Sequence, residues 1–421
     1  MIEGHNSSAI EYQSQQDYEL SGSYLEGLSK IEDVLNNLEE RRENVLKGGV
    51  NCIPFPFERF NSEIPGVEQG QYVVVTANAK VGKTNLTNFL YVFNVLDYAF
   101  LHPDRCSVHI IYFALEESVQ RIIERYMSHL LYKLDGIRVA PADLRSTSVD
   151  NPIDKETLKL FSTKKYKDRL DFFEKCVEFN TEDTNPTGIL RVCEAYAKKV
   201  GKYRCHKQKS AGLNGREIEV FDSYTQNDPN HYKMVIIDHI GLVDKEQGFK
   251  TKDAVDKMSE YFVKYLRNRY KFTCIAIQQQ ASESEGLEAV KAKKMVPTAA
   301  TLGDSKYTAR DADLVLGLFD PSKFGMKDYR GYLIMGERGE GLRTNARFLN
   351  VVANRNGEMG GICPLFFDGA VCDFEELPKP SDTDIQKYYD KTKELLINRM
   401  QRKSTIKKVL SLLSFIKFIK F

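Results

Sequence analysis

The sequence lacks the features that mark secreted, membrane-spanning and zinc-stabilised proteins. No apolar run is long enough to cross a membrane, and the segment from Met1 to Gln16 is too polar for a signal peptide. The eight cysteines stand singly, with no Cys-x-x-Cys pair, and Cys205-His206 has no second ligand pair at metal spacing. We therefore expect reduced thiols, no disulfide framework, no zinc site and a cytoplasmic location.

The chain also lacks a strong overall charge. Its formal net charge is +1, so any contact with nucleic acid must come from local basic patches. Apolar residues make up 42% and charged residues 28%, which is typical of globular proteins. The 421 residues can hold one large α/β domain with additions, or two modest domains.

The stretch from Gln71 to Thr84, QYVVVTANAKVGKT, predicts a strand, a tight loop and a helix start, which is the context of a phosphate-binding loop. Free backbone N–H groups at a helix start can hold phosphate, Lys83 can reach the β- and γ-phosphates, and Thr84 can offer a hydroxyl to Mg²⁺. Ala77 stands where the general motif has its first glycine. On these residues alone, a solvated Lys-Thr pair at a helix start stays open as the alternative. The expected nucleotide-contacting residues are Ala77, Asn78, Ala79, Lys80, Val81, Gly82, Lys83, Thr84 and Asn85.

Two later strands end in acids. Residues 108–114 are followed by Glu116, which could orient a water against the γ-phosphate or could be an ordinary first-turn helix acid. Residues 233–238 form an apolar run that ends in Asp238, an acid suited to supporting a phosphate-bound Mg²⁺. Strands that alternate with helices at these spacings predict a mostly parallel, doubly wound sheet.

A fourth strand, residues 272–277, runs into three glutamines, one of which could sense the γ-phosphate. The loop after it and the loop after the Asp238 strand are basic, and they could neutralise a DNA backbone or simply be solvated. The expected DNA-binding residues are Lys250, Lys252, Lys291, Lys293 and Lys294.

The flanks of the core are predicted from their patterns. Residues 1–22 read as a polar arm, and residues 23–50 contain an amphipathic helix that either packs on its own domain or docks on a neighbouring subunit. Residues 201–231 look like an inserted loop or surface hairpin. The turn Asn354 to Gly357 places Arg355 where it is either a plain turn residue or an arginine finger. Residues 379–421 form a basic helical tail that could dock on the fold, bind a partner or lie on a membrane surface.

In order along the chain, these motifs resemble the RecA-like motor domain of DnaB-type replicative helicases of superfamily 4. The resemblance covers IPFPFERFNSEIPGVEQGQYVVVTANAKVGKT, IIYFALEE, VIIDHIGLV, CIAIQQQ, PTAATLGDSKYTARDADLVLGLF and VVANRNGEMGGICPLFF, from about Asn51 to Phe374. That family commonly has alanine at the position of Ala77. The resemblance implies an α/β fold with a RecA-like P-loop NTPase core over residues 51–378, a linker helix before it and the helical tail after it.

The resemblance also implies roles. Glu116 would be the catalytic glutamate, Asp238 the Walker B acid, Gln279 the sensor with Gln278 as alternative, and Arg355 the arginine finger. ATP and Mg²⁺ would be bound, single-stranded or forked DNA would be the track, and the chain would form a homo-oligomer, a hexamer, with primase or a helicase loader as further partners. We expect a DNA-replication helicase.

Departures from the family qualify this expectation. Ala353 stands where members usually have a lysine, so activation between subunits is weaker or uses another group such as Arg347. The family's amino-terminal helical domain has no room in the expected architecture, which would suit a phage or other mobile replicon. Two rival functions stay open: a RecA-like recombinase or mediator ATPase, and a structural assembly component with a degenerate nucleotide site.

Overall fold

The computed structural model describes residues 31–32, 34–147, 152–209, 217–292, 294–337 and 340–398. The chain divides into two compact units, Met1–Asn51 and Cys52–Phe421. The expected arm at 1–22, Lys293 and the end of the basic tail lie outside the described residues. Among the helices of the described ranges, none combines the length and the apolar character that crossing a membrane requires.

The first unit contains the expected amphipathic helix, at residues 31–46 apart from the undescribed position 33. Its end is fixed by two asparagines: Asn51 Nδ2 donates to Arg41 O at 2.8 Å, and Asn44 Nδ2 donates to Asn51 Oδ1 at 3.1 Å. Its apolar side chains are more than half exposed, namely Ile31, Val34, Leu35, Leu38, Val45 and Leu46. The helix therefore has an apolar stripe that the described residues of its own unit leave exposed.

The second unit is built on a nine-stranded sheet in the order β15-β14-β13-β10-β3-β9-β8-β4-β5. From β10 to β5 every neighbouring pair is parallel, which confirms the expected mostly parallel sheet. Apart from the short edge strand β5, these strands are mostly apolar runs because both faces of a parallel sheet are covered. They are β3 (Tyr72–Ala77), β4 (Ser107–Ala114), β5 (Val177–Asn180), β8 (His231–Asp238), β9 (Thr273–Gln279) and β10 (Leu314–Phe319).

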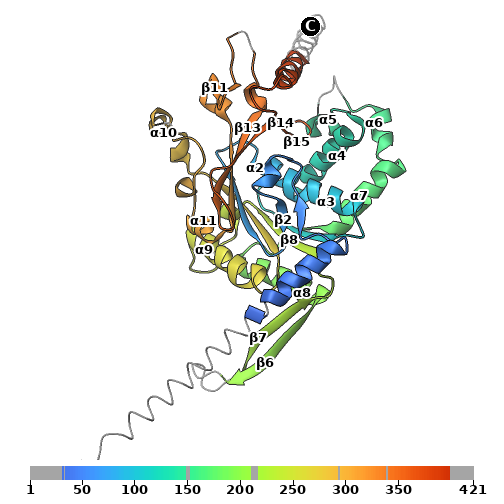
Figure 1. The fold of residues 1–421 in the computed structure, drawn as a ribbon, viewed down its shortest axis with the longest axis vertical. Helices are drawn as coiled ribbons and strands as arrows, with labels where there is room; N and C mark the ends of the chain where they lie inside the picture. The colour runs from blue at the N-terminus through green and yellow to red at the C-terminus, as the bar shows by residue number, and fades with distance from the viewer. Residues whose placement is uncertain are drawn as a thin grey trace, which may run out of the picture. The chain divides into compact units, whose positions relative to one another are not determined.

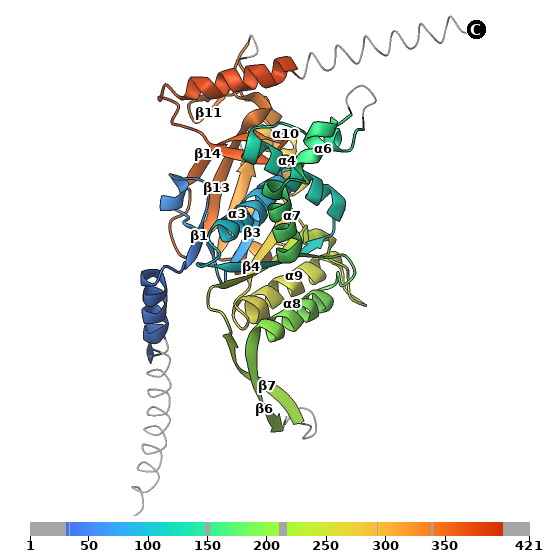
Figure 2. The same cartoon turned by 90° about the vertical axis from the view of Figure 1, so that its right-hand side faces the viewer.

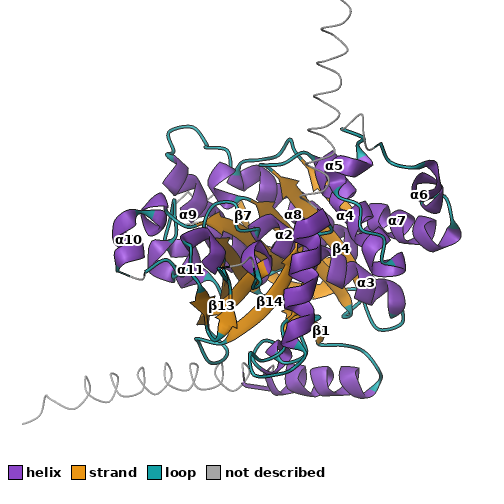
Figure 3. Cartoon of the chain, turned by 90° about the horizontal axis from the view of Figure 1, so that it is seen from above, coloured by secondary structure: helices purple, strands orange, loops and turns teal. Residues whose placement is uncertain are grey.

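Helices cover both faces of this sheet (Figure 3). On one face, alternate residues such as Tyr72, Val235 and Cys274 pack in one core with the helices α8 (Pro186–Val200), α9 (Thr251–Tyr261) and η5 (Phe262–Arg267). The other face contacts the continuous run α2 (Lys83–Thr87), η2 (Asn88–Phe93) and α3 (Asn94–Leu101), and also α7 (Lys164–Cys176). Further helices are α4 (Val119–Asp135), α5 (Pro141–Leu144), α6 (Lys155–Leu160), α10 (Leu287–Lys291) and α11 (Tyr307–Asp311).

Beyond β10 the sheet continues with antiparallel strands (Figure 1). These are β13 (Ala346–Asn354), β14 (Ile362–Asp368) and β15 (Asp373–Glu376). The predicted turn at Asn354 to Gly357 begins the connection between β13 and β14. The first part of the tail, a helix at residues 385–398, packs on this extension, where Tyr388 lies 5.4 Å from the ring of Phe366. The described part of the tail therefore docks on its own fold.

Smaller elements complete the unit. The entry segment pairs β1 (Cys52–Pro54) with β2 (Gly66–Glu68), and β11 (Asp328–Tyr329) pairs with β12 (Tyr332–Leu333). Strand β10 begins at Leu314. Just before it, the Asp313 carboxylate accepts the Tyr72 N–H at 2.8 Å and pairs with Arg267 at 2.8 Å. These contacts hold Asp313 at the end of the ladder, so the strand starts after it.

The insert at 201–231 is a hairpin of β6 (Gly201–Lys209) and β7 (Glu217–Gln226), which extends beyond α8 in Figure 2. Its base is held by rings: Tyr224 lies 5.3 Å from Tyr270, and Tyr203 lies 5.7 Å from Phe221. Of the two expected forms, loop or hairpin, the structure has the hairpin.

Candidate functional site

The phosphate-binding loop connects β3 to α2 at the carboxyl edge of the sheet. Gly82 has φ +112°, a left-handed conformation that glycine adopts without strain, and it places Lys83 as the first residue of α2. The Lys83 side chain is buried, at 8% exposure. Burial lowers the pKa of Lys83, against the opposing effect of Glu116 and Asp238. A desolvated cation at a helix start is a site for a phosphate chain.

The metal side of the site joins α2 to β8. Thr84 Oγ1 donates to Asp238 Oδ1 at 3.2 Å, and the Tyr112 hydroxyl lies 3.2 Å from Asp238 Oδ2. Both expected ligand residues supply oxygen, which Mg²⁺ prefers. Asn85 Oδ1 and Asn88 Nδ2, on the same helical run, are buried without a hydrogen-bond partner among the described residues. The residues present therefore fit a phosphate-bound Mg²⁺ held by Thr84 and Asp238.

Asp238 is an unusual acid because it is almost completely buried. Burial raises its pKa to about 6, and the nearby Glu116 adds to this effect, while the hydrogen bonds from Thr84 and Tyr112 oppose it. An acid with this pKa is partly protonated in weakly acidic solution and gains most from a cation that binds beside it.

Glu116 lies beside Asp238 because the ends of β4 and β8 are tied together. Ala114 pairs with Asp238 in the parallel ladder, and the backbone N–H groups of Leu115 and Glu116 both donate to Asp238 O, at 2.9 and 3.0 Å. The Glu116 side chain is 54% exposed, with one carboxylate oxygen 3.9 Å from His239 Nε2. An exposed carboxylate next to the metal side could hold a water molecule in position.

The three glutamines at the end of β9 are not equivalent. Gln278 is fully buried on the α9 face of the sheet, where its Nε2 donates to Ser305 O at 2.7 Å. Gln280 donates to Thr76 Oγ1 at 2.9 Å. Gln279 lies on the opposite face with Ala77, the face that α2 covers, and its half-buried side chain has no hydrogen bond to the described residues. The alternative sensor Gln278 is therefore used structurally, and the sensor role stays predicted for Gln279.

Arg347, in β13, and Arg355, the residue after β13, differ in the same way. Arg347 is buried, its Nε donates to Val81 O at 2.7 Å, and its Nη1 lies 2.9 Å from Asp320 Oδ2. It braces the phosphate loop of its own chain, and these bonds speak against the alternative in which Arg347 acts on another subunit. Arg355 is half exposed, 3.8 Å from Asp313, and its Nη2 donates to Arg310 O at 2.9 Å.

Arg355 also lies far from its own phosphate loop. Leu314 pairs with both Val73 and Asn354, which puts Arg355 level with the amino end of β3, whereas the phosphate loop follows the carboxyl end. The length of the strand between these levels is roughly 20 Å. If Arg355 is a finger, it must act on a second molecule.

The predicted DNA-contacting lysines lie on loops that follow the carboxyl ends of the neighbouring strands β8 and β9. The phosphate loop leaves the sheet on the same side. Lys250 and Lys252 lie at the start of α9, and Lys291 is the last residue of α10. Lys250, Lys252, Lys291 and Lys294 are all exposed. Lys252 is the most constrained of them, 5.3 Å above the Tyr307 ring and 4.0 Å from Asp256.

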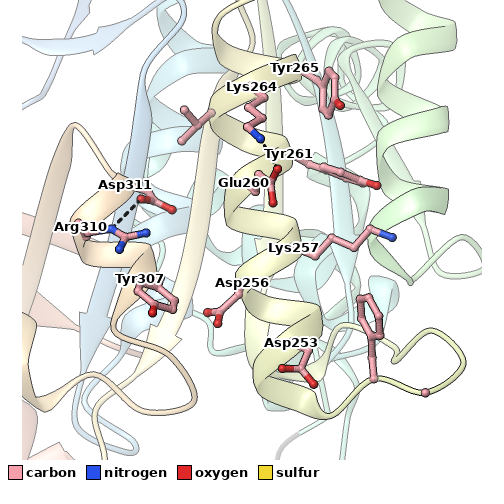
Figure 4. A pocket seen from close by; sticks show the side chains of 13 residues that line it. Asp253, Asp256, Lys257, Glu260, Tyr261, Lys264, Tyr265, Tyr307, Arg310 and Asp311 are labelled. Atoms are coloured by element: carbon pink, nitrogen blue, oxygen red, sulfur yellow. Dashed lines mark hydrogen bonds and ion pairs between the residues drawn. The ribbon is translucent and has the colours of Figure 1, made fainter. Parts of the chain in front are cut away.

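A hollow lies between α9 and α11 (Figure 4). Its volume is about 1000 Å³, and its lining includes Asp256, Glu260, Lys264, Tyr307 and Arg310. Several of its charges neutralise one another, as in the pair of Arg310 with Asp311 at 3.3 Å. None of the phosphate-loop residues lines it, so it is not the nucleotide site.

The structure adds residues that the sequence analysis did not select. Tyr112 touches Asp238, and Ser284, Glu285 and Lys323 touch the phosphate loop. Tyr112 is one of several apolar-looking strand residues, and Glu285 is one of several acids in a short polar turn. No local pattern distinguishes either one, because each is positioned by pairing between strands far apart in sequence.

A parallel sheet with a phosphate loop after β3, and with an acid at the end of β8 that meets the start of α2, is the arrangement of P-loop NTPases. More specifically, the fold is that of the ATPase domains of DnaB-type replicative helicases. It superimposes on a structure titled as a DnaB-like replicative helicase and its interactions with primase, with a TM-score of 0.54 and 15% sequence identity over 82% of this chain. It also superimposes on a second solved structure, described as an ATPase domain, with a TM-score of 0.55 and 15% identity over 83% of this chain.

The extent of these matches differs. The chain covers 99% of the second structure, the ATPase domain, but 66% of the DnaB-like helicase chain. No protein-family model matches the sequence, and no curated protein matches it by sequence. At this identity the comparisons establish the fold, which agrees with the resemblance read from the motifs.

Proposed function

We infer that the protein is the motor of an ATP-driven DNA helicase that acts in replication as a ring of identical subunits, a hexamer. One observation supports this most: Thr84 and Asp238, 154 positions apart in sequence, meet at 3.2 Å beside the buried Lys83. Such an arrangement is costly for an unliganded protein, because a cation and an acid are both desolvated. A bound nucleotide would offset this cost.

Each residue has one task in this proposal. Lys83 and the N–H groups at the start of α2 bind the phosphates, Glu116 orients the attacking water, and Gln279 responds to the γ-phosphate. Thr84 and Asp238 hold Mg²⁺, which when bound would screen the charge of the phosphates. The exposed lysines after β8 and β9 would follow the backbone of single-stranded DNA.

Assembly into a ring is supported by two features of the described residues. Arg355 is at the wrong edge to complete its own site, and helix 31–46 has an apolar stripe that a neighbouring subunit could bury. The DnaB-like helicase of the comparison was studied with primase, so a primase or loader is a reasonable partner to test here too.

The test is ATP hydrolysis by the purified protein with Mg²⁺, with and without single-stranded DNA. We expect DNA to stimulate hydrolysis several-fold and the stimulation to fade with added salt, because phosphate contacts weaken as salt rises. Hydrolysis per chain should fall on dilution as the oligomer dissociates. Lys83→Ala should abolish turnover, whereas the exposed Lys159→Ala on α6 should not change it.

Other outcomes would point elsewhere. Turnover that persists in Lys83→Ala would refute the site, and turnover per chain that does not change down to the monomer would refute the ring. Nucleotide binding without turnover would favour an assembly component with a degenerate site, for which Ala353 in place of the family's lysine is the supporting observation. Strand unwinding on a forked DNA substrate is then the measurement that establishes a helicase.

A further inference from the structure

A short turn after β9 is fastened to the phosphate loop. The turn is η6 (Ser282–Glu285), at the start of the loop that contains the predicted DNA-contacting lysines. Asn78 Nδ2 donates to the buried Ser284 Oγ at 3.0 Å, and the Ala79 N–H donates to Glu285 Oε1 at 2.8 Å. Two consecutive residues of the phosphate loop are thus bonded to two consecutive residues of the turn.

Lys323, in η8 (Pro321–Phe324) after β10, completes the arrangement. Its Nζ lies 2.7 Å from Glu285 Oε2 and donates to Ala79 O at 2.7 Å. Only 28% of the Lys323 side chain and 29% of the Glu285 side chain are exposed, so solvent screens the pair incompletely. Partial burial acts to raise the pKa of Glu285, but the bonds from Lys323 and Ala79 outweigh it and hold that pKa below its usual value.

The Glu285 carboxylate is bonded to a backbone N–H group of the loop that is proposed to bind phosphate. Backbone N–H groups of a phosphate loop bind anions, and here one of them already binds an anion that belongs to the chain. Lys83 is close enough to feel both Glu285, which raises its pKa, and Lys323, which lowers it. A triphosphate beside Lys83 would therefore meet a fixed negative charge at the same loop.

We propose that Glu285 is a built-in competitor for the phosphate loop, that ATP displaces it, and that Lys323 then exchanges the carboxylate for the triphosphate. The proposal rests on ATP binding at this loop. Glu285 is a positioning residue, and Lys323 becomes a phosphate-binding residue. Because η6 leads directly into α10 and Lys291, displacement of Glu285 also moves the predicted DNA loop, so nucleotide and DNA binding are coupled.

The first experiment measures the affinity for a fluorescent non-hydrolysable ATP analogue and for ADP, each with Mg²⁺. Glu285→Gln removes the charge but leaves a side chain that can still accept the Ala79 N–H. We expect it to tighten binding of the ATP analogue roughly tenfold, and that of the less charged ADP by less. The matched control is Glu283→Gln, which makes the same charge change at an exposed position of the same turn and should leave both affinities unchanged.

The second experiment asks whether Lys323 changes partners. Lys323→Met is compared in the wild-type and in the Glu285→Gln background. If Lys323 reaches the triphosphate, Lys323→Met weakens binding of the ATP analogue at least severalfold in both backgrounds. If Lys323 only neutralises Glu285, Lys323→Met has no effect on binding of the ATP analogue once residue 285 is Gln. That result would refute the exchange.

Failure of this proposal differs from failure of the proposed function. If the wild-type protein binds nucleotide and Glu285→Gln binds it no better, the competitor is refuted and the motor stands. If neither protein binds nucleotide, both are refuted. Binding by Glu285→Gln alone would support the competitor strongly.

A measurement that leaves Glu285 in place guards against a folding defect in the variant. The sequence contains no tryptophan, so Ala292→Trp, at the exposed end of α10, gives a single fluorescent reporter. We expect its emission to change when the ATP analogue is added. An emission that stays constant at saturating analogue would refute movement of the loop.

Discussion

Two arginines, Arg347 near the start of β13 and Arg355 directly after its end, lie in opposite surroundings. At one end Arg347 is buried against the phosphate loop of its own chain, bonded to Val81 O and paired with Asp320. At the other end Arg355 is half exposed and bonded to backbone oxygen near Arg310, level with the amino end of β3. β13 thus runs from the carboxyl ends of the parallel strands, where the phosphate loop lies, to their amino ends.

The difference indicates which functions one chain can complete. The carboxyl edge has a phosphate loop, a metal-side acid and an internal brace, all built from a single chain. The arginine of β13 beside this site, Arg347, is already bonded on several sides. If Arg355 acts as an arginine finger, a second molecule must supply it.

The largest expected effect on stability comes from replacing Arg347. We expect Arg347→Met to lower the free energy of unfolding by about 3–5 kcal/mol, because Asp320 keeps its charge in a buried position without its partner. Urea unfolding at neutral pH measures this loss. Arg355→Ala, just after the same strand, is the matched variant and should change stability by less than about 0.5 kcal/mol. A loss below about 1 kcal/mol for Arg347→Met would show that the brace is not needed.

For ATP hydrolysis we expect the reverse order of the two arginines, with the larger loss from the Arg355 variant. We expect Arg355→Ala to lower kcat for ATP about a thousandfold while nucleotide affinity stays unchanged, because an arginine finger acts on the charge of the transition state. Steady-state hydrolysis together with fluorescent-nucleotide binding separates the two effects. The control is Arg310→Ala, a neighbouring arginine on α11 that is 67% exposed. Equal losses for both variants would mean that Arg355 is an ordinary turn arginine.

Asp238, the buried acid at the carboxyl end of β8, is proposed to serve function at a cost in stability. The folded-state pKa of Asp238 is about 6, above the usual value, so the ionised side chain costs stability above pH 6. We expect Asp238→Asn to raise the free energy of unfolding by about 2–3 kcal/mol at pH 8, since each pKa unit is worth about 1.4 kcal/mol. This gain should shrink as the pH falls from about 6 to 4 and disappear at about pH 3, where the wild-type carboxyl is protonated in both states.

The same group predicts the pH dependence of Mg²⁺-dependent nucleotide binding. Protonation of Asp238 as the pH falls through about 6 removes a metal ligand, so affinity with Mg²⁺ should decrease below that pH. Titration of the fluorescent nucleotide from pH 5 to 8, with and without Mg²⁺, measures it. An Asp238→Asn protein with full hydrolysis, or with lower stability at pH 8, would contradict this role.

The smallest expected effect concerns the exposed lysines. We expect the double variant Lys291→Ala and Lys294→Ala to reduce the salt dependence of single-stranded DNA affinity by about 0.7 in log–log slope for each lysine. Hydrolysis without DNA should not change. A pair of exposed lysines on other elements, Lys159→Ala and Lys264→Ala, is the control. An unchanged slope would show that these loops are only solvated.

The sequence predicts the parallel core well because its signals are local. Apolar runs at 72–77, 233–238 and 272–277 become β3, β8 and β9, and the loop before Lys83 is bounded by a strand and a helix. The three glutamines could not be told apart, because their difference lies in which face of β9 each occupies. The hairpin of β6 and β7 was one of two expected forms, since its flanking rings meet only through tertiary packing.

The site is less predictable than the sheet. Thr84 and Asp238 were proposed from separate motifs, and the structure brings them together. The roles of Glu116, Gln279 and Arg355 stay predictions. No sequence pattern points to Tyr112, Glu285 or Lys323. Their contacts with the site depend on which strands are neighbours in the sheet, and the order of the strands in the sequence does not reveal this.

The central claim is that one chain supplies the phosphate loop and another supplies Arg355. Mixing two inactive variants tests it directly: Lys83→Ala keeps the arginine, and Arg355→Ala keeps the phosphate loop. If the subunits exchange and the claim holds, an equal mixture should recover about a quarter of wild-type hydrolysis, because one in four random head-to-tail contacts pairs an intact loop with an intact arginine. A mixture that exchanges subunits, as shown by energy transfer between labelled chains, but hydrolyses no faster than its components would contradict the claim.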